Sequence, residues 1–377
     1  MKIPFRKYHL IQLLEEYDRS DWPIDVSINL YFRAHKALGS KDRHEIAETA
    51  ISMIRWLGLI EEHEDWASRI DGFEKIQPDL DQVIDKFGNQ YPLHKCVSFP
   101  NDLFQLFVEH FGQEKAIEIC LTSNQPAPTV VRVNPLKISR DDLLKLWKEK
   151  GYPVKPCELS ENGIVFEKRM NFFHLDEFKN GFFEVQDEGS QLLANLVAAK
   201  PGDQVLDYCA GAGGKTLAFA PFMQGQGQIY LHDIRTKILS EAKKRLRRAG
   251  IQNAQFIDYD SPKLRKLKKK MDWVLVDTPC SGTGTIRRNP DMKWRFTQAM
   301  LDNLIRDQRV IFEKALSFVK PGGHIVYATC SLLKQENGEQ AEYFLKTHSL
   351  ELVGQPFESF PCPGEMDGFY GMVFHKK

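Results

Sequence analysis

From about residue 189 onward, apolar strand-like runs alternate with segments of helical length, and this alternation constrains the fold more than any other feature of the chain. The strand-like runs read DQVLDYC, GQIYLHD, NAQFID, MDWVLVD and HIVYATC, and between them lie helical segments such as KTLAFAPFM and KILSEAKKRLRRAG. Strands that are joined by helices of crossover length form a parallel sheet with helices on both faces. The pattern predicts a doubly wound α/β fold, in which ligands bind at the carboxyl ends of the strands.

Two regions of different character precede this alternation. Residues 1–92 read as a helical domain, because Leu10, Leu13, Leu14 and Tyr17 recur at helical spacing. Residues 93–180 contain two helical stretches, the strand-like PTVVRVNP, the helical SRDDLLKLWKEKG and the short runs GIVFEK and GFFEVQ. We therefore expect a compact α+β middle domain, followed by the doubly wound domain over residues 181–377.

Composition narrows the class of protein. A chain of 377 residues can bury a substantial core without disulfides or metal ions. Its seven cysteines are scattered and form no C-x-x-C pair, which disfavours a disulfide framework and a zinc site. No apolar stretch resembles a signal peptide or a spanning helix, so we expect a cytoplasmic protein without a membrane partner.

Positive charge is concentrated in residues 235–270, which carry thirteen Lys or Arg against three acidic residues. A concentrated basic surface is typical of proteins that bind a phosphate backbone, and we expect Arg245, Arg247, Lys268 and Lys269 to contact phosphates. A solvated helix face explains the same charge run equally well.

The segment VLDYCAGAGGKT (205–216) reads as a strand, a glycine-rich turn and a helix start. It is not an ATPase P-loop, because that pattern needs glycine where Cys209 stands, and it does not fit G-x-G-x-x-G. A strand aspartate before the glycines and a second strand ending in Asp233 favour an adenosyl ligand without a pyrophosphate, such as S-adenosylmethionine, over a merely tight turn. Asp260, preferred to Asp258, would add a polar contact from the third strand. The residues expected at the cofactor are Asp207, Cys209, Ala210, Gly211, Gly213, Gly214, Lys215, Asp233, Asp260 and Asp277.

Two cysteines follow apolar strands in similar settings, Cys280 in VLVDTPCSGTG and Cys330 in HIVYATCSLL. Both are flanked by small residues and are expected at the cofactor's edge of the sheet. A thiolate beside S-adenosylmethionine suits methylation of C5 of cytosine, because addition of the thiolate to C6 makes C5 nucleophilic. The C5 proton must then leave before the enzyme is released, and a second group can assist this step.

Four segments carry a resemblance to a known family: DYCAGAGGKT, DTPCSGTGTIRRNPDMKW, YATCSLLKQENGEQ and PGEMDGFYG. In this order and spacing they resemble the signature segments of the RsmB/Sun family of RNA cytosine-5 methyltransferases. VQDEGSQL resembles the family's link between an RNA-contacting middle domain and the catalytic core. ALGSKDRHEIAETAISMIR resembles part of the NusB-like helical domain of the bacterial ribosomal RNA branch, in a region shorter than usual.

The resemblance implies a Rossmann-like S-adenosylmethionine-dependent methyltransferase domain and a role for each site residue. Cys330 would be the nucleophile and Cys280 would assist breakdown of the covalent adduct. Asp277 would lie against the polar edge of the flipped cytosine, and Lys215 would lie near the reacting base. The implied substrate is RNA, in particular small-subunit ribosomal RNA, and we expect a monomer. The chain departs from the family at CAGAGGKT, where C-A-A-P-G-G-K-T is commoner, and at the threonine of DTPC.

Two other functions compete with this interpretation. A DNA cytosine-5 methyltransferase uses the P-C cysteine as its nucleophile, which would leave Cys330 unexplained. A non-catalytic ribosome-assembly factor would retain the fold for RNA binding alone. This non-catalytic alternative is disfavoured because RNA binding alone needs no thiols, whereas the chain retains Cys280, Cys330, Asp277 and Lys215.

Overall fold

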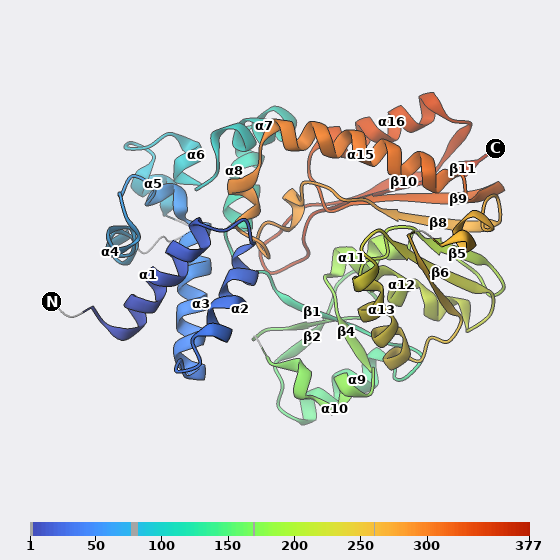
Figure 1. The fold of residues 1–377 in the computed structure, drawn as a ribbon, viewed down its shortest axis with the longest axis horizontal. Coiled ribbons are helices and arrows are strands. Elements are labelled where there is room, and N and C mark those ends of the chain that lie inside the picture. The colour runs from blue at the N-terminus through green and yellow to red at the C-terminus, as the bar shows by residue number, and fades with distance from the viewer. Residues whose placement is uncertain (1–2, 77–81, 169, 260) are drawn as a thin grey trace. The chain divides into compact units, whose positions relative to one another are not determined.

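The computed structural model describes residues 3–76, 82–168, 170–259 and 261–377 (Figure 1). The chain forms two compact units. The first comprises residues 1–126 and 285–300, and the second comprises residues 127–284 and 301–377. The domain boundaries that we expect from the sequence stay a prediction.

The first unit is helical and has its own apolar core. Leu13, Leu14, Ala50 and Met53 are fully buried in it, as the helical spacing in this region predicts. Its helices are α1 (Phe5–Asp18), α2 (Ile24–Ala34), α3 (Ser40–Arg55), η1 (Leu57–Leu59), α4 (Trp66–Ile76), α5 (Val83–Phe87), α6 (Leu93–Cys96), α7 (Asn101–Phe111) and α8 (Gln113–Ser123).

The segment 285–300 completes this unit, although it comes from far along the chain and includes the short helix η5 (Met292–Arg295). The side chain of Lys293 is buried, and its Nζ donates to the carbonyl oxygen of Arg55 at 2.8 Å and to Oδ1 of Asn124 at 2.6 Å. The same ammonium lies 4.3 Å from the ring centroid of Phe99. A buried lysine thus finds acceptors for its charge within the helical unit.

The second unit contains a small antiparallel sheet with the strand order β2-β3-β1-β4. Trp147 packs against Phe166 and Phe183 and closes the core on one face of this sheet. The elements are β1 (Thr129–Val133), α9 (Arg140–Glu149), β2 (Val154–Pro156), β3 (Gly163–Phe166), η2 (Phe172–His174), α10 (Asp176–Lys179) and β4 (Phe183–Val185).

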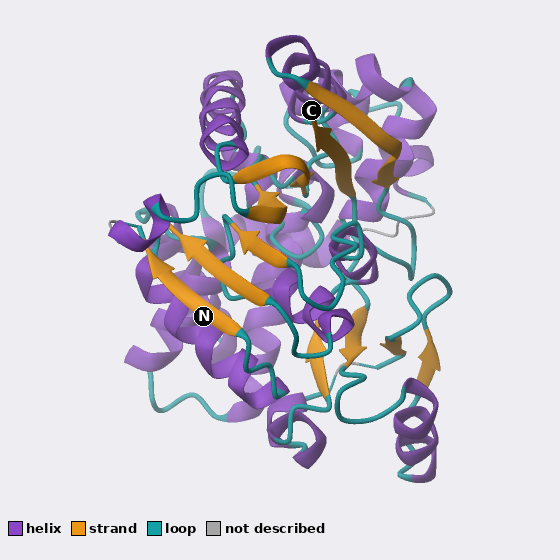
Figure 2. Ribbon diagram, turned by 90° about the vertical axis from the view of Figure 1, so that its right-hand side faces the viewer, coloured by secondary structure: helices purple, strands orange, loops and turns teal. Residues whose placement is uncertain are grey.

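A seven-stranded sheet with the order β10-β11-β9-β8-β5-β6-β7 forms the rest of this unit. Strands β9, β8, β5, β6 and β7 are parallel neighbours, whereas β10 and β11 are antiparallel additions at one edge. The strands, coloured orange in Figure 2, are β5 (Gln204–Asp207), β6 (Gln228–Asp233), β7 (Ala254–Asp258), β8 (Met271–Asp277), β9 (Val319–Thr329), β10 (Leu350–Ser359) and β11 (Phe369–Lys376).

Helices cover both faces of the large sheet (Figure 1). Successive strand residues alternate between the faces, so Val205 and Leu275 pack in one core while Leu206 and Val274 pack in the other. This arrangement confirms the predicted doubly wound α/β fold. The helices of the unit are α11 (Glu188–Ala194), α12 (Gly214–Phe219), η3 (Ala220–Met223), α13 (Thr236–Ala249), α14 (Pro262–Arg265), η4 (Thr283–Thr285), α15 (Gln298–Leu316), η6 (Lys334–Glu336) and α16 (Gly338–Thr347).

Helix α11 begins after Asp187, whose side chain accepts a hydrogen bond from the backbone N–H of Gly189, and it ends at Ala194. Among the residues that the structure describes, no helix combines the length and the apolar character that crossing a membrane requires.

Candidate active site

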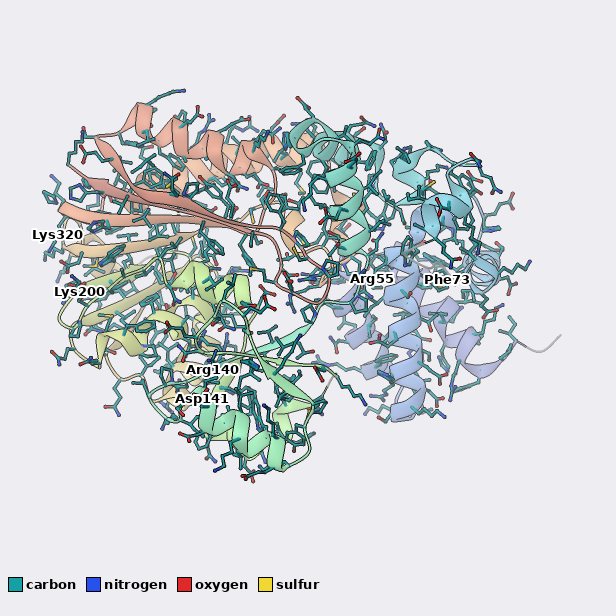
Figure 3. All side chains as sticks on the ribbon, turned by 180° about the vertical axis from the view of Figure 1, so that it is seen from behind. Arg55, Phe73, Arg140, Asp141, Lys200 and Lys320 are labelled. Carbon is teal, nitrogen blue, oxygen red and sulfur yellow. The ribbon has the colours of Figure 1, made fainter. Side chains whose placement is uncertain are left out.

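The carboxyl ends of β5, β6, β8 and β9 form one edge of the large sheet, and the residues expected at the site follow these strand ends. Lys200 precedes β5 and Lys320 lies in the first residues of β9, so both mark the opposite edge of the sheet in Figure 3. In an open parallel sheet the carboxyl edge is where ligands bind.

The structure brings Cys280 and Cys330 together. Their Sγ atoms lie 3.2 Å apart, and the backbone N–H of Cys330 points to Sγ of Cys280 at 3.3 Å. Neither cysteine is in a disulfide. The hydrogen bond with Cys330, together with burial, raises the pKa of the Cys280 thiol well above its ordinary value. Cys280 is therefore a thiol at neutral pH.

Lys215 and Asp277 form an ion pair next to the cysteines, with 2.5 Å between Nζ and Oδ2. Burial alone would lower the pKa of Lys215, but the charge and the hydrogen bond of Asp277 raise it above its ordinary value. The charges of Lys215 and Cys330 also interact. The cation of Lys215 is therefore close enough to Cys330 to act on a charge at its sulfur.

The glycine turn between β5 and α12 depends on backbone conformations that suit glycine. Gly211 and Gly213 have φ angles of 51° and 75°, in the left-handed region. A Cβ on Gly213 would lie 3.0 Å from Leu246 Cδ1, so helix α13 also restricts this position. A Cβ on Gly214 would meet nothing within 4 Å, which leaves space beside the first residue of α12.

Two aspartates that were expected at the cofactor end their strands beside this turn. The buried side chain of Asp207 accepts a hydrogen bond from Thr216 Oγ1 at 2.6 Å through Oδ2, while Oδ1 has no hydrogen-bond partner in the described part of the chain. Asp233 Oδ2 accepts from the backbone N–H of Gly211 at 2.8 Å, and Oδ1 accepts from the backbone N–H of Arg235 at 2.8 Å. Burial alone would raise the pKa of Asp233, but hydrogen bonds from Arg235 and Gly211 lower it below its ordinary value.

The other residues expected at the cofactor lie in or near the same turn. The backbone N–H of Ala210 donates to the carbonyl oxygen of His232 at 2.9 Å, which ties the turn to β6. Burial raises the pKa of the Cys209 thiol, so this cysteine is not ionised at neutral pH. Asp260 lies outside the described residues, and the alternative, Asp258, is exposed at the end of β7.

Arginines from outside the turn hold its carbonyl groups, a role that no local sequence pattern indicates. Arg132 of β1 donates from Nη1 to the carbonyl oxygen of Gly214 at 3.1 Å. Arg245 of α13 donates from Nη1 to the carbonyl oxygen of Ala212 at 2.9 Å, and its Nη2 lies 3.1 Å from Oε2 of Glu184. From the sequence we expect Arg245 to contact a phosphate. The positive charge of its segment does not predict the contacts with Ala212 and Glu184.

These features fit S-adenosylmethionine. Oδ1 of the buried Asp207 has no partner among the described residues, and Asp233 places a second carboxylate at the end of the neighbouring strand. Together with the space beside Gly214, these groups can receive an adenosyl group and an amino acid moiety. Asp207, Asp233 and the backbone of 209–214 would hold it.

Comparison with known proteins identifies the family. Residues 194–370 match the family model described as 16S rRNA methyltransferase RsmB/F, and residues 99–172 match the ferredoxin-like domain of the same methyltransferases. A methyltransferase homologue from Pyrococcus horikoshii has a similar structure, with a TM-score of 0.66 and 28% identity over 78% of this chain and 99% of that chain.

Two curated relatives are bacterial. The probable ribosomal RNA small subunit methyltransferase B of Synechocystis sp. is 33% identical over 282 residues, which are 74% of this chain and 62% of that protein. The ribosomal RNA small subunit methyltransferase B of Vibrio vulnificus is 32% identical over 304 residues, which are 78% of this chain and 70% of that protein. The aligned part of the chain thus spans between 62% and 70% of the length of these two relatives. The chain belongs to the RsmB/F family of 16S rRNA methyltransferases, whose cofactor is S-adenosylmethionine.

Proposed function

We propose that this protein transfers a methyl group from S-adenosylmethionine to C5 of a cytosine in small-subunit ribosomal RNA, in the cytoplasm. The observation that carries the proposal is the pair of sulfurs of Cys280 and Cys330, 3.2 Å apart at the carboxyl edge of the sheet. The names of the bacterial relatives, ribosomal RNA small subunit methyltransferase B, support the substrate. A cytosine inside a duplex is out of reach, so the target base lies in a loop or is flipped out.

In the proposed reaction Cys330 is the nucleophile. Its thiolate, which lies near the ammonium of Lys215, forms a bond between Sγ and C6 of the base, and the displaced electron pair makes C5 nucleophilic. Cys280 does not compete for this role, because the raised pKa keeps its sulfur protonated. Bound S-adenosylmethionine supplies an electrophilic methyl group for C5.

Cys280 assists the release of the product. Once Cys330 is bonded to C6 it is a neutral thioether, so the neighbouring thiol no longer raises the pKa of Cys280. Cys280, which is only partly buried, then loses its own proton to solvent, and its thiolate accepts the C5 proton. The electron pair of the C5–H bond restores the C5–C6 double bond and expels the Cys330 thiolate. Asp277, oriented by Lys215, accepts hydrogen bonds from the polar edge of the cytosine.

Single substitutions of the two cysteines test this mechanism. Cys330→Ala removes the nucleophile, so neither methyl transfer nor a covalent complex with RNA should form. Cys280→Ala leaves attack and methyl transfer intact but impairs elimination, so the protein should accumulate on methylated RNA. A denaturing gel with labelled RNA and S-adenosylmethionine resolves the slowly migrating covalent species. Cys362→Ala is a matched control, because this cysteine also follows a proline but does not follow a strand of the parallel sheet.

Two outcomes would contradict the assignment. A covalent complex in Cys330→Ala and none in Cys280→Ala would reverse the roles and favour the scheme of the DNA enzymes. Unchanged turnover in both variants would leave the thiols without a catalytic role. Bisulfite sequencing of ribosomal RNA from cells with and without the gene tests the substrate, because the proposal requires one 5-methylcytosine to be missing without the gene.

A further inference from the structure

A buried carboxylate joins the two loops that carry the cysteines. Glu336 lies at the end of η6 and has no solvent-exposed surface. Its Oε1 accepts hydrogen bonds from the backbone N–H of Ser281 and from Nε2 of Gln308, both at 2.9 Å. Its Oε2 accepts from Ser331 Oγ at 2.5 Å and from Ser281 Oγ. One side chain therefore binds residues from three separate segments of the chain.

The four donors match the chemistry of an ionised carboxylate. Such a group accepts hydrogen bonds only, and its two oxygens offer about four lone-pair positions. Hydrogen bonds to a charged acceptor are stronger than those between neutral groups, and a charge that is buried without them is costly. The network is therefore tightly specified, and Ser281, Ser331 and Gln308 are buried with Glu336.

The bound residues are the sequence neighbours of the cysteines. Ser281 follows Cys280 directly, and Ser331 follows Cys330 directly. Gln308 of α15 also donates to the carbonyl oxygen of Pro279 at 3.1 Å, so the backbone is held on both sides of Cys280. The proposed mechanism makes no direct use of these residues.

We propose that Glu336 is a positioning residue, whose carboxylate ties Ser281 to Ser331 and thereby keeps the sulfurs of Cys280 and Cys330 in contact. The catalytic consequence rests on the proposed function, because the thiol that assists release must stay beside the thiol that attacks. The geometric claim does not rest on it and can be measured without RNA.

Disulfide formation with diamide measures the proximity of the two sulfurs. Each thiol loses its hydrogen, the N=N bond of diamide is reduced to a hydrazine, and one S–S bond forms. Mass spectrometry of the digested protein gives the rate at which the linked Cys280 and Cys330 peptides appear. We expect Glu336→Ala to slow this rate at least tenfold relative to the wild-type protein, and Glu336→Gln, which keeps the shape and one acceptor oxygen, to slow it less.

The direction of this effect separates geometry from thiol reactivity. The charge of Glu336 contributes to the raised pKa of Cys280, so its removal alone would make the thiol more acidic and the oxidation faster. A slower reaction in Glu336→Ala therefore reports separation of the sulfurs. Glu177→Ala is the control, because it removes another buried glutamate of the same unit, one that pairs with Lys150. Its rate should equal that of the wild-type protein.

An unchanged rate in folded Glu336→Ala would overturn the proposal. Where that variant does not fold, Ser331→Ala decides, because it removes the hydroxyl that joins the Cys330 loop to Glu336 and, at 3.1 Å, to the hydroxyl of Ser281. A rate reduced severalfold supports the proposal, and a wild-type rate overturns it.

The catalytic consequence has its own measurement. In Glu336→Ala, kcat should fall at least tenfold while the Kd of S-adenosylmethionine stays within twofold, and Glu336→Gln should restore part of kcat. Should the wild-type protein form the disulfide rapidly but methylate no RNA, the proposed function fails and the positioning role of Glu336 stands.

Discussion

Arg132 and Gly214 connect the small sheet to the glycine turn: Nη1 of Arg132 donates to the carbonyl oxygen of Gly214 at 3.1 Å. The same guanidinium contacts Oε1 of Gln186, whose Nε2 donates to that carbonyl as well, at 3.3 Å. The conformation of the turn therefore depends on a residue that lies outside the large sheet, in β1.

Replacement of Arg132 by methionine should weaken binding of S-adenosylmethionine. Methionine fills much of the space but leaves the Gly214 carbonyl with fewer donors, so we expect the Kd to rise about tenfold, which corresponds to about 1.4 kcal/mol. Isothermal titration calorimetry measures the change. Arg140→Met is the control, because Arg140, labelled in Figure 3, lies on α9 and donates to the carbonyl oxygen of Ser160 instead. Equal affinities in both variants would contradict a role for Arg132 in the turn.

Asp233 should contribute directly to binding of the cofactor. Its replacement by alanine removes the carboxylate that we propose accepts hydrogen bonds from the ribose hydroxyls, and it also removes the hydrogen bond from the backbone N–H of Gly211. Charge-assisted hydrogen bonds of this kind contribute about 1.5–3 kcal/mol each, so the Kd of S-adenosylmethionine should rise tenfold or more. Calorimetry on folded Asp233→Ala checks this, and an unchanged Kd would count against the cofactor site. Asp258→Ala, at the exposed end of the next strand, tests whether Asp258 instead of Asp260 contributes to the affinity for S-adenosylmethionine.

Asp207 should make the stability of the protein depend on pH. Burial raises the pKa of its carboxyl group from 3.8 to about 7 in the folded protein. Between these values the folded state binds more protons than the unfolded state, so the free energy of unfolding should fall as pH rises through this window. The effect is on the order of 1.4 kcal/mol for each unit by which the pKa is raised.

Asp207→Asn isolates this effect, because an amide does not titrate. Thermal unfolding without cofactor at pH 5 and pH 8 should show a smaller loss of Tm in the variant than in the wild-type protein. The same dependence on pH in both proteins would mean that Asp207 is ionised throughout.

Exposed basic residues of the stretch 235–270 should bind the RNA backbone. Arg247, Lys268 and Lys269 are exposed, and their reversal to glutamate should weaken binding and flatten its dependence on salt. The log–log slope should fall by about 0.7–0.9 for each phosphate that the variant no longer neutralises. Filter binding at several salt concentrations gives the slope, and an unchanged slope would identify a solvated face. Arg245 is left intact in this variant, because it contacts Glu184 and Ala212.

Local periodicity predicted the parallel part of the large sheet but not its antiparallel edge. The apolar runs that end at Asp207, Asp233 and Asp277 form adjacent strands, as expected. The strands β10 and β11 were not predicted, because β10 is largely exposed and includes the sequence GQP, and its pairing with β11 shifts register between Val353 and Phe357. Such a pairing depends on the partner strand and not on the local pattern.

The candidate site shows the same limit. The strand-ending aspartates and cysteines were predictable, because a polar residue after an apolar run stands out locally. Glu336 did not stand out among the polar residues of KQENGEQ, and its burial follows from the meeting of three segments that are distant in sequence. The role of Arg132 could not be predicted for a similar reason, because a single arginine in a strand resembles a solvated residue until its acceptors are known.

The segment 285–300 gives the first unit a particular order of assembly during synthesis. Residues 1–126 leave the ribosome before Lys293, whose hydrogen bonds to Arg55 and Asn124 can form only after residues 127–293 have also been made. Until then, helices α1–α8 lack the ammonium of Lys293 as a donor to the carbonyl oxygen of Arg55 and to Oδ1 of Asn124. The first unit therefore completes its native contacts only after strands β5, β6, β7 and β8 of the large sheet have been translated.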